Sequence, residues 1–295
     1  MGKYVGRVDQ SRAQMGAELV LGTAQFETSY GIMRKTTREF DACQLLELAT
    51  SLGVTSLDTA PGYGNAQEMI GSCGWKGAIH TKIPGNENAH HSLKDSLLKL
   101  KRHRVQVAYF HDPDVLNRDE IFFREAHESL IPEQTEHLGV SVYTPDEFNS
   151  ALTNPFISVL QAPINAIDHR ITDDQLKQAA SMGKRVYARS ILLQGMLLQV
   201  SSALPYFLSG LAPTIDRLGA ITSDMRINRM EILMQSVLTR PGISGVIVGA
   251  EAPAQLVDIV AAFHAPPLTE DVRAAVYSLR VDDLGIIDPR MWPRT

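Results

Sequence analysis

Residues 19–24 read LVLGTA, an apolar run that ends in the turn Gly22-Thr23-Ala24. The run is rich in Val and Leu without polar alternation, which is typical of a strand buried on both faces of a parallel sheet. An open, doubly wound sheet would usually carry a G-x-G-x-x-G turn directly after such a first strand. Because this turn lacks that pattern, the stretch favours the other large parallel architecture, a closed barrel.

Seven further apolar runs follow this one, with amphipathic helical segments between them. The eight predicted strands cover residues 19–21, 54–57, 78–80, 105–110, 139–142, 158–160, 185–188 and 245–248. Strand–helix units repeated eight times within about 250 residues predict an α/β fold of the (β/α)8 TIM barrel type.

Local signals mark where several of the helices start. Thr36 and Glu39 form a capping-box pattern, and Pro145 and Pro253 each stand where a first helical turn is expected. The spacing is regular except between the seventh and eighth strands. There, residues 192–240 form a long insert, for which we predict one helix around residues 215–239.

No linker, repeat or low-complexity tract divides the 295 residues. We therefore predict one barrel domain over residues 1–295, with an N-terminal extension at 1–18 and a C-terminal tail at 266–295. Long βα loops and such tails commonly cover the mouth of a barrel. The apolar stretch 192–198 could line a pocket or pack under the insert. In the tail, Arg290 could hold an acidic substrate and Trp292 could wall the pocket, or both could dock the tail for stability.

Composition excludes several functional classes. The net charge of −5 disfavours nucleic-acid binding. No apolar run reaches the roughly 18 residues of a membrane span, and the N-terminal residues lack the apolar core of a signal peptide. Cys43 and Cys73 are too few for a secreted disulfide framework, so we expect a reducing, cytoplasmic setting and thiols without a chemical role. Since C-x-x-C and H-E-x-x-H motifs are absent from the sequence, we expect no metal.

Polar side chains stand where successive predicted strands end. Asp58 ends the second strand, Lys82 the third and His111 the fourth. The carboxyl ends of barrel strands meet at one mouth, where barrel enzymes place their chemistry. Each residue alone has a structural explanation, as a turn cap, a rim charge or a local hydrogen bond, but together they predict an active site.

Tyr63 adds a proton donor to this set. It lies five residues after Asp58, in a glycine-flanked loop. A tyrosine has an ordinary pKa near 10, and a nearby ammonium would lower that pKa. We therefore expect Asp58, Lys82 and Tyr63 to act as a general-acid relay, with His111 orienting a carbonyl oxygen.

At these residues the sequence resembles the aldo-keto reductase family, over roughly residues 19–263. The resemblance rests on LGTAQF (21–26), GVTSLDTAPGYGNAQEMIG (53–71), HTKIP (80–84), FHD (110–112), LGVSVY (138–143), LQAPIN (160–165) and IVGAEAPAQL (247–256). It implies that Asp58, Tyr63, Lys82 and His111 are the catalytic tetrad, with Tyr63 as the proton donor. It also implies reduction of a small aldehyde or ketone by hydride from a nicotinamide cofactor that lies across the barrel mouth.

The resemblance implies cofactor-binding positions as well. Ser141 and Gln161 match residues that hold the nicotinamide carboxamide, and Gly22 and Thr23 match a close backbone approach. Gly249 and Ala250 lead into a helix whose N-terminal amides could take a phosphate. The remaining cofactor candidates are Arg189, Ser190, Glu251 and Gln255.

Three departures from the family pattern bear on this site. Val142 stands where the family often has Asn, so one carboxamide bond is lost or is supplied by Asn165. Arg189 stands where the family often stacks an aromatic ring, and its guanidinium could stack or bind a phosphate. The stretch after strand eight has Glu251 instead of the cation that commonly selects NADP(H), and this carboxylate would suit a ribose hydroxyl of NAD(H). Family habit favours NADP(H), and these residues leave NAD(H) open.

Two other functions fit the same sequence. One is a nicotinamide-binding sensor or accessory subunit with little turnover, which the Val142 and Arg189 departures would allow. The other is a barrel lyase or isomerase that uses Lys82 as a Schiff-base nucleophile. Tyr63 and Asp58 beside the lysine favour the reductase. Nothing in the sequence fixes the oligomeric state.

Overall fold

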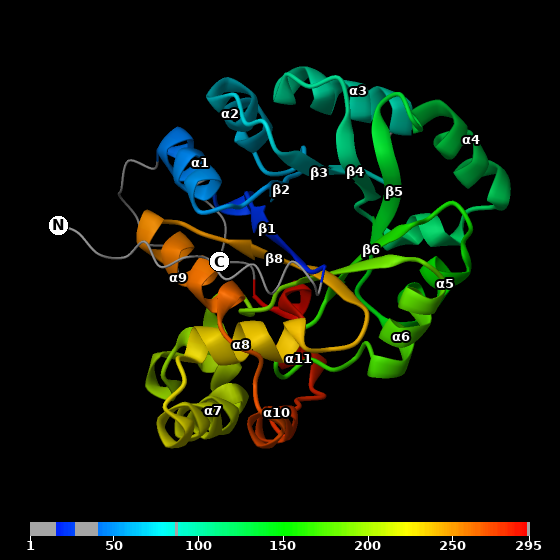
Figure 1. Cartoon of the computed structure of the whole chain (residues 1–295). Coiled ribbons are helices and arrows are strands. Elements are labelled where there is room, and N and C mark those ends of the chain that lie inside the picture. The colour runs from blue at the N-terminus through cyan, green and yellow to red at the C-terminus, as the bar shows by residue number, and fades with distance from the viewer. Residues whose placement is uncertain (1–15, 27–40, 86–87, 294–295) are drawn as a thin grey trace.

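The computed structural model describes residues 16–26, 41–85 and 88–293. Eight parallel strands close into a barrel in sequence order, and β1 pairs with β8 to complete the ring (Figure 1). The strands are β1 Glu18–Gly22, β2 Ser56–Asp58, β3 Ala78–Ile83, β4 Val105–Phe110, β5 Thr135–Ser141, β6 Val159–Pro163, β7 Arg185–Arg189 and β8 Ile243–Gly249. The predicted (β/α)8 TIM barrel is confirmed.

Helices surround the barrel and shield the outer face of its strands. The helices of the described residues, including those of the insert and the tail, are α1 Ala42–Ser51, α2 Ala66–Cys73, α3 Ala89–Leu100, α4 Glu120–Leu130, α5 Pro145–Thr153, α6 Asp173–Ser181, α7 Ala212–Met225, α8 Arg229–Leu238, α9 Pro253–His264, α10 Glu270–Tyr277 and α11 Leu284–Ile287. The predicted starts at Pro145 and Pro253 are confirmed, and Thr144 with Glu147 forms a capping box before α5. The pattern at Thr36 and Glu39 lies outside the described residues.

The strands are rich in apolar residues because most of their side chains are buried on both faces. In β1, Leu19 and Leu21 belong to the large cluster shared with the helices, whereas Val20 belongs to a separate small cluster with residues from other strands. Successive strand side chains point to opposite faces, so Val20 faces the barrel interior. This double burial explains why the runs lack polar alternation.

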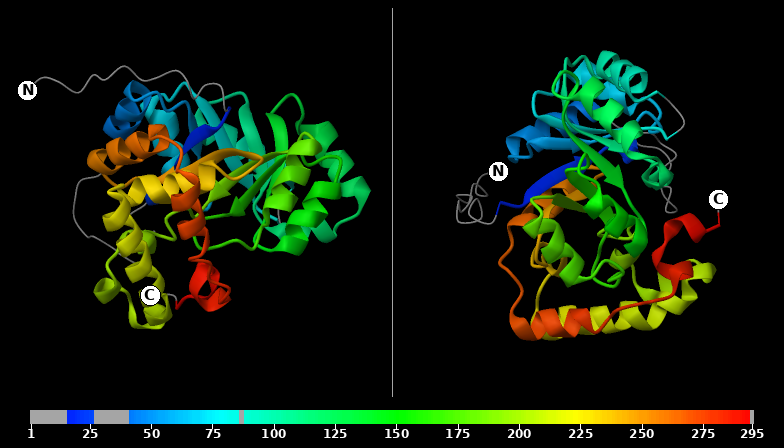
Figure 2. Two further views of the ribbon diagram at one scale, coloured as in Figure 1. Left: turned by 60° about the horizontal axis from the view of Figure 1, so that its bottom comes forward. Right: turned by 90° about the vertical axis from the view of Figure 1, so that its right-hand side faces the viewer.

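The insert after β7 and the C-terminal tail form a second apolar cluster beside the barrel. Leu193, Met196 and Leu197 of the insert share it with Ile287 and Trp292 of the tail. Figures 1 and 2 show α7, α8 and α10 together on this side of the molecule. The single helix predicted around residues 215–239 is wrong: it is divided into α7 and α8 at Arg226, which has a left-handed backbone with φ of 54°.

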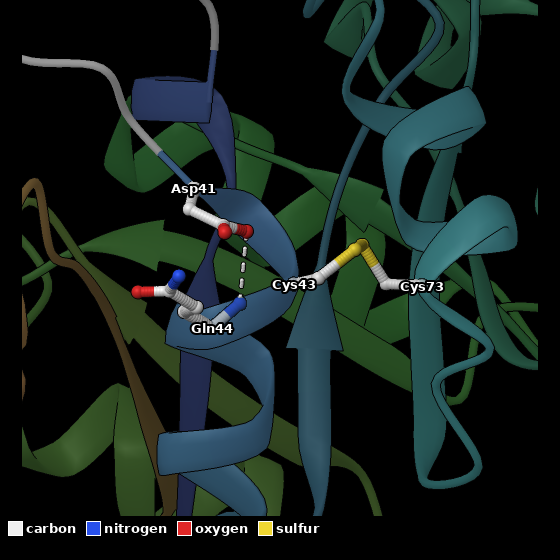
Figure 3. Close-up of a disulfide and its surroundings, with 4 residues drawn as sticks. All are labelled: Asp41, Cys43, Gln44 and Cys73. Carbon is white, nitrogen blue, oxygen red and sulfur yellow. Dashed lines mark hydrogen bonds between the residues drawn. A yellow bond between two sulfur atoms is a disulfide. The ribbon is translucent and has the colours of Figure 1, made fainter.

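A disulfide joins the first two helices of the barrel. Cys43 of α1 is bonded to Cys73 at the end of α2, with 5.0 Å between their Cα atoms (Figure 3). Cys43 lies two residues after Asp41, which is the N-cap of α1. The Asp41 carboxylate accepts a hydrogen bond from the Gln44 amide. A reducing, cytoplasmic setting implies free thiols, but in this structure Cys43 and Cys73 are bonded to each other.

Removing the disulfide is expected to lower the free energy of unfolding. The bond closes a loop across a sequence separation of 30 residues, and the double variant Cys43→Ser, Cys73→Ser should lose about 2–4 kcal/mol because the unfolded chain regains freedom. Urea unfolding without reductant measures this loss. The unaltered chain in reductant should match the variant, and equal stability with and without reductant would contradict the prediction.

Candidate active site

A cavity of about 530 Å³ lies at the carboxyl ends of the barrel strands. All four predicted catalytic residues line it, and so do nine of the ten predicted cofactor residues. These nine are Gly22, Thr23, Ser141, Gln161, Arg189, Ser190, Gly249, Glu251 and Gln255. The tenth, Ala250, is fully buried and is not among the lining residues.

Asp58 and Lys82 form a buried ion pair at the ends of β2 and β3. The Lys82 ammonium donates to the two carboxylate oxygens of Asp58 at 2.6 and 2.7 Å, and to the Thr59 carbonyl at 3.1 Å. Its side chain is only 1% exposed. Burial lowers the pKa of Lys82, and the Asp58 carboxylate opposes this change by favouring the charged form.

Tyr63 reaches the same cavity from the loop after β2. The Lys82 nitrogen lies 5.5 Å from the centre of the Tyr63 ring. Burial, and then the Asp58 carboxylate, raise the pKa of Tyr63 well above its ordinary value, while Arg189 opposes the rise. The pKa of Tyr63 is therefore raised and not lowered as expected, because burial and the Asp58 carboxylate outweigh the nearby positive charge. The phenol keeps its proton at neutral pH.

His111 completes the tetrad as a neutral imidazole. Burial, and then the positive charge of Lys82, lower the pKa of His111 to about 4. Within the described ranges, the ring has no hydrogen-bond partner, although it lines the cavity. An N–H of the ring is therefore available to donate to an oxygen of a bound molecule.

The neutral state of His111 predicts how stability changes with pH. Between pH 6.5 and pH 4 the unfolded chain protonates this histidine and the folded chain does not, so the free energy of unfolding should fall as pH falls through that window. His111→Gln should show a smaller loss between pH 7 and pH 4.5 in urea unfolding. His103→Gln, at an exposed position, is the control. An identical loss in the His111 variant would contradict the prediction.

Gln161 connects the tetrad to the other side of the barrel. It lies in the middle of β6, and its side-chain amide donates to an Asp58 carboxylate oxygen at 2.8 Å. Ser141, at the end of β5, also lines the cavity. The two residues proposed for the carboxamide therefore lie at one place, next to the ion pair.

The wall next to Asp58 is made by the ends of β1 and β8, because Gly22 of β1 pairs with Asp58 on one side and with Gly249 on the other. Gln25 follows β1, and its buried Oε1 has no hydrogen-bond partner among the described residues. A Cβ built on Gly249 would come within 2.1 Å of that oxygen, so the end of the Gln25 side chain lies directly against the glycine and would have to move if a larger residue stood there. The start of α9 has no side-chain cap at Ala252, which leaves amides of its first turn without a side-chain partner, whereas Pro253 has no N–H and the Glu251 amide donates to the Gln255 side-chain oxygen at 2.7 Å.

Contacts bear on two expectations from the departures. The Asn165 oxygen accepts from the Ile167 and Asp168 amides, its nitrogen donates to the Ser190 carbonyl, and Asn165 is not among the residues that line the cavity. Arg189 donates to the Val142 carbonyl at 3.2 Å. Its guanidinium therefore lies at the end of β5.

The stretch 192–198 both lines the cavity and packs under the insert, and Trp292 docks the tail. Leu192 and Leu198 line the cavity, while Leu193, Met196 and Leu197 are buried under the insert. Trp292 packs in the second apolar cluster and donates to the Ile286 carbonyl at 3.2 Å, so it docks the tail and is not among the cavity-lining residues.

Several cavity residues had no clear sequence signal. Gln25, Tyr143, Gln194 and Met230 line the cavity. Gln25 lies two residues after Thr23 and Tyr143 lies directly after Val142, so both could have been found by extending those two stretches. Gln194 has φ of 51°, a conformation that a non-glycine residue rarely adopts. The position of Gln194 in the cavity therefore could not be predicted from the fact that it is a glutamine.

Neither a metal site nor a membrane helix is found in the described parts of the chain. No group of three or more His, Cys, Asp or Glu side chains there could hold a metal ion. No helix within those ranges is long and apolar enough to cross a membrane.

Comparison with known proteins agrees with this geometry. A model of the aldo/keto reductase family matches residues 18–280. A 6-dehydroglucose reductase from Novosphingobium aromaticivorans is 24% identical over 251 residues, which cover 74% of this chain and 79% of the relative.

Two solved structures share the fold. An aldo-keto reductase from Bacillus halodurans in its holo form superposes with a TM-score of 0.73 at 22% identity, covering 89% of this chain and 91% of that one. A thermostable aldo-keto reductase in complex with the inhibitor epalrestat gives a TM-score of 0.68 at 21% identity, covering 88% of this chain and 94% of that one.

Proposed function

The chain belongs to the aldo/keto reductase family and is an oxidoreductase, and from this premise we propose that it reduces an aldehyde or ketone to an alcohol with NAD(P)H. The observation that carries the proposal is the buried Asp58–Lys82 ion pair beside Tyr63 and His111 in one cavity. Tyr63 is proposed as the proton donor and His111 as the residue that orients the substrate.

Each catalytic side chain has a defined task in this scheme. A bound reduced nicotinamide supplies the hydride for the carbonyl carbon. The neutral His111 ring and the protonated Tyr63 hydroxyl donate hydrogen bonds to the carbonyl oxygen, and Tyr63 passes its proton to that oxygen. Lys82 then stabilises the negative charge left on Tyr63, and Asp58 keeps Lys82 charged and in position.

The cavity suits an extended nicotinamide dinucleotide. It runs from Ser141 and Gln161 to Glu251 and Gln255 at the start of α9. We propose that the first pair binds the carboxamide, that Gly22, Thr23, Ser190 and Gly249 admit the backbone of the cofactor, and that amides in the first turn of α9, which follows Ala250, take a phosphate. The unpartnered Gln25 oxygen at Gly249 supports a ligand donor there.

Glu251 is the residue through which the choice between cofactors can be tested. Its exposed carboxylate would repel a 2′-phosphate, so NADP(H) use should improve when it is replaced. Glu251→Arg is expected to shift the ratio of the NADH and NADPH dissociation constants toward NADPH by about tenfold. Fluorescence titration measures both constants. Asp258→Arg, at an exposed position of α9 seven residues after Glu251, makes the same charge change, and an equal shift there would show that Glu251 has no specific role.

Hydride transfer from bound cofactor tests the proposed activity directly. The protein is loaded with NADPH or NADH and mixed with a carbonyl panel that includes aromatic aldehydes and, because one relative is a 6-dehydroglucose reductase, oxidised sugars. We expect the absorbance of the reduced cofactor at about 340 nm to fall in step with alcohol formation. Tight cofactor binding without oxidation by any carbonyl would instead favour a nicotinamide-binding sensor.

A further inference from the structure

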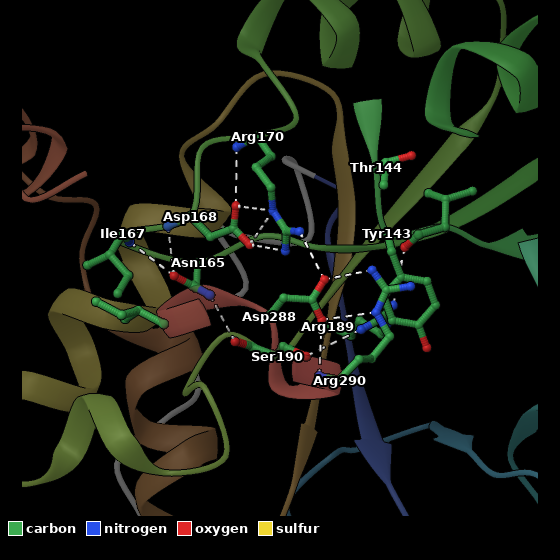
Figure 4. A network of polar contacts seen from close by, with 12 residues as sticks. Tyr143, Thr144, Asn165, Ile167, Asp168, Arg170, Arg189, Ser190, Asp288 and Arg290 are labelled. Carbon is green, nitrogen blue, oxygen red and sulfur yellow. Dashed lines mark hydrogen bonds and ion pairs between the residues drawn. The ribbon is translucent and has the colours of Figure 1, made fainter. Parts of the chain in front are cut away.

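Arg189 has an environment that differs from those of two other guanidinium groups near the barrel mouth. Arg170 pairs with Asp168 at 2.7 Å and with Asp288 at 3.3 Å, and Arg290 pairs with Asp288 at 2.6 Å (Figure 4). Arg189 makes no ion pair with any residue that the structure describes. Of the three, Arg189 is the one that lines the cavity with the tetrad.

The guanidinium of Arg189 is held in place without being neutralised. It donates to the Val142 carbonyl at 3.2 Å and to the Ser190 hydroxyl at 3.4 Å, and its central carbon lies 4.2 Å from the centre of the Tyr143 ring. These contacts use two of its five N–H groups. The remaining donors keep the fork geometry that matches a carboxylate.

The C-terminal tail fixes Tyr143 and keeps Arg290 occupied. Arg290 lies 3.6 Å from the centre of the Tyr143 ring, and its backbone and side chain both donate to Asp288. Burial would raise the pKa of Asp288, but the hydrogen bonds from Arg290 and Arg170 outweigh burial and bring it to about 2. A third carboxylate, Glu147, accepts the Tyr143 and Thr144 amides at the start of α5. Asp168, Asp288 and Glu147 therefore all have other partners, and none of them forms an ion pair with Arg189.

We propose that Arg189 binds a carboxylate on the substrate, so that the chain reduces carbonyl compounds that carry an acid group. This inference rests on the proposed carbonyl reduction. An unpaired cation in a partly buried cavity favours an anion that restores its electrostatic balance. Arg189 also acts on Tyr63 and His111, since it is among the charges that influence both groups. A carboxylate on Arg189 would therefore lie near a carbonyl held by those two residues.

A cofactor phosphate is the other anion that Arg189 could bind. The contacts favour the substrate, because the guanidinium lies against the end of β5 with Val142 and Tyr143. The uncapped amides proposed for a phosphate belong to α9, which follows β8. The experiment must still separate these two sources of negative charge.

The test compares a carboxylate with its neutral amide. The value of kcat/KM is measured with 4-formylbenzoate and 4-formylbenzamide for the unaltered chain, Arg189→Gln, Arg189→Lys and the control Arg273→Gln, which alters an exposed pair on α10. We expect the unaltered chain and the control to prefer the carboxylate, Arg189→Gln to reduce that preference by at least about tenfold, and Arg189→Lys to retain part of it.

Several outcomes would overturn the inference. One is an unaltered chain with no preference for the carboxylate, and another is a preference that survives in Arg189→Gln. A third is a tenfold weaker NADPH affinity in Arg189→Gln with the substrate preference intact, which would assign the anion to the cofactor.

Binding separates this inference from the proposed reduction. Calorimetric titration compares benzoate with benzamide on the unaltered chain and on Arg189→Gln. A benzoate preference that is lost in the variant, together with no reduction of any carbonyl, would support the Arg189 site and refute the proposed function. Equal binding of benzoate and benzamide to the unaltered chain would overturn the Arg189 site.

Discussion

Replacing Tyr63 with Phe is expected to lower the turnover number for carbonyl reduction by about a hundred- to ten-thousand-fold, the range that general acid catalysis contributes. The change removes the hydroxyl that burial and Asp58 keep protonated. It leaves the ring near Lys82, whose nitrogen lies 5.5 Å from the ring centre. The affinity for NAD(P)H should therefore change little. Steady-state rates and fluorescence titration measure the two effects separately.

A matched control for this variant is Tyr277→Phe. Tyr277 is 53% exposed and belongs to α10, which is outside the cavity. Its loss of a hydroxyl should leave both the rate and the affinity unchanged. Full turnover in Tyr63→Phe would refute the assignment of the proton donor, and loss of cofactor binding would show that the variant disturbs the cavity as a whole.

Asp58→Asn is expected to have the largest effect on stability. The change leaves the Lys82 ammonium, 1% exposed, without its carboxylate. Breaking a buried pair in this way costs about 3–5 kcal/mol of unfolding free energy. Activity should fall as well, because Lys82 then loses the group that keeps it charged. Urea unfolding and kcat measure the two losses, with Asp174→Asn, in an exposed pair of α6, as the control.

A double variant shows whether the unpaired charge is the cause. Asp58→Asn combined with Lys82→Met removes both charges, so it should recover part of the stability that Asp58→Asn loses. Activity should stay low, since both residues of the relay are gone. A double variant less stable than Asp58→Asn would indicate that packing, rather than the charge, explains the loss.

The strands and the tetrad could be predicted because each rests on a strong local cause. Runs such as residues 105–110 are apolar because both strand faces are buried, and this pattern needs no knowledge of distant contacts. Asp58, Lys82 and His111 were found because parallel strands place their carboxyl ends at one mouth. Once the barrel is known, the convergence of these side chains follows from topology.

Other features depend on long-range contacts that local patterns do not encode. The pKa of Tyr63 depends on how deeply the folded chain buries its ring and on the Asp58 carboxylate beside it. The bond between Cys43 and Cys73 depends on the distance between two helices. The break at Arg226 depends on a left-handed backbone in a residue other than glycine. Each of these is decided by the folded surroundings and has no signature in residue type or spacing.

The closure of the barrel by β1 and β8 determines when this active site can exist. Gly22 and Gly249 are paired residues of the first and last strands, and both line the cavity. Gln161 and Asp58, 103 residues apart, join across the ring. A chain emerging from the ribosome therefore cannot form the complete cavity until β8 has been synthesised. Chains that end earlier lack one wall of the site, so truncated products should be inactive even where their first units have folded.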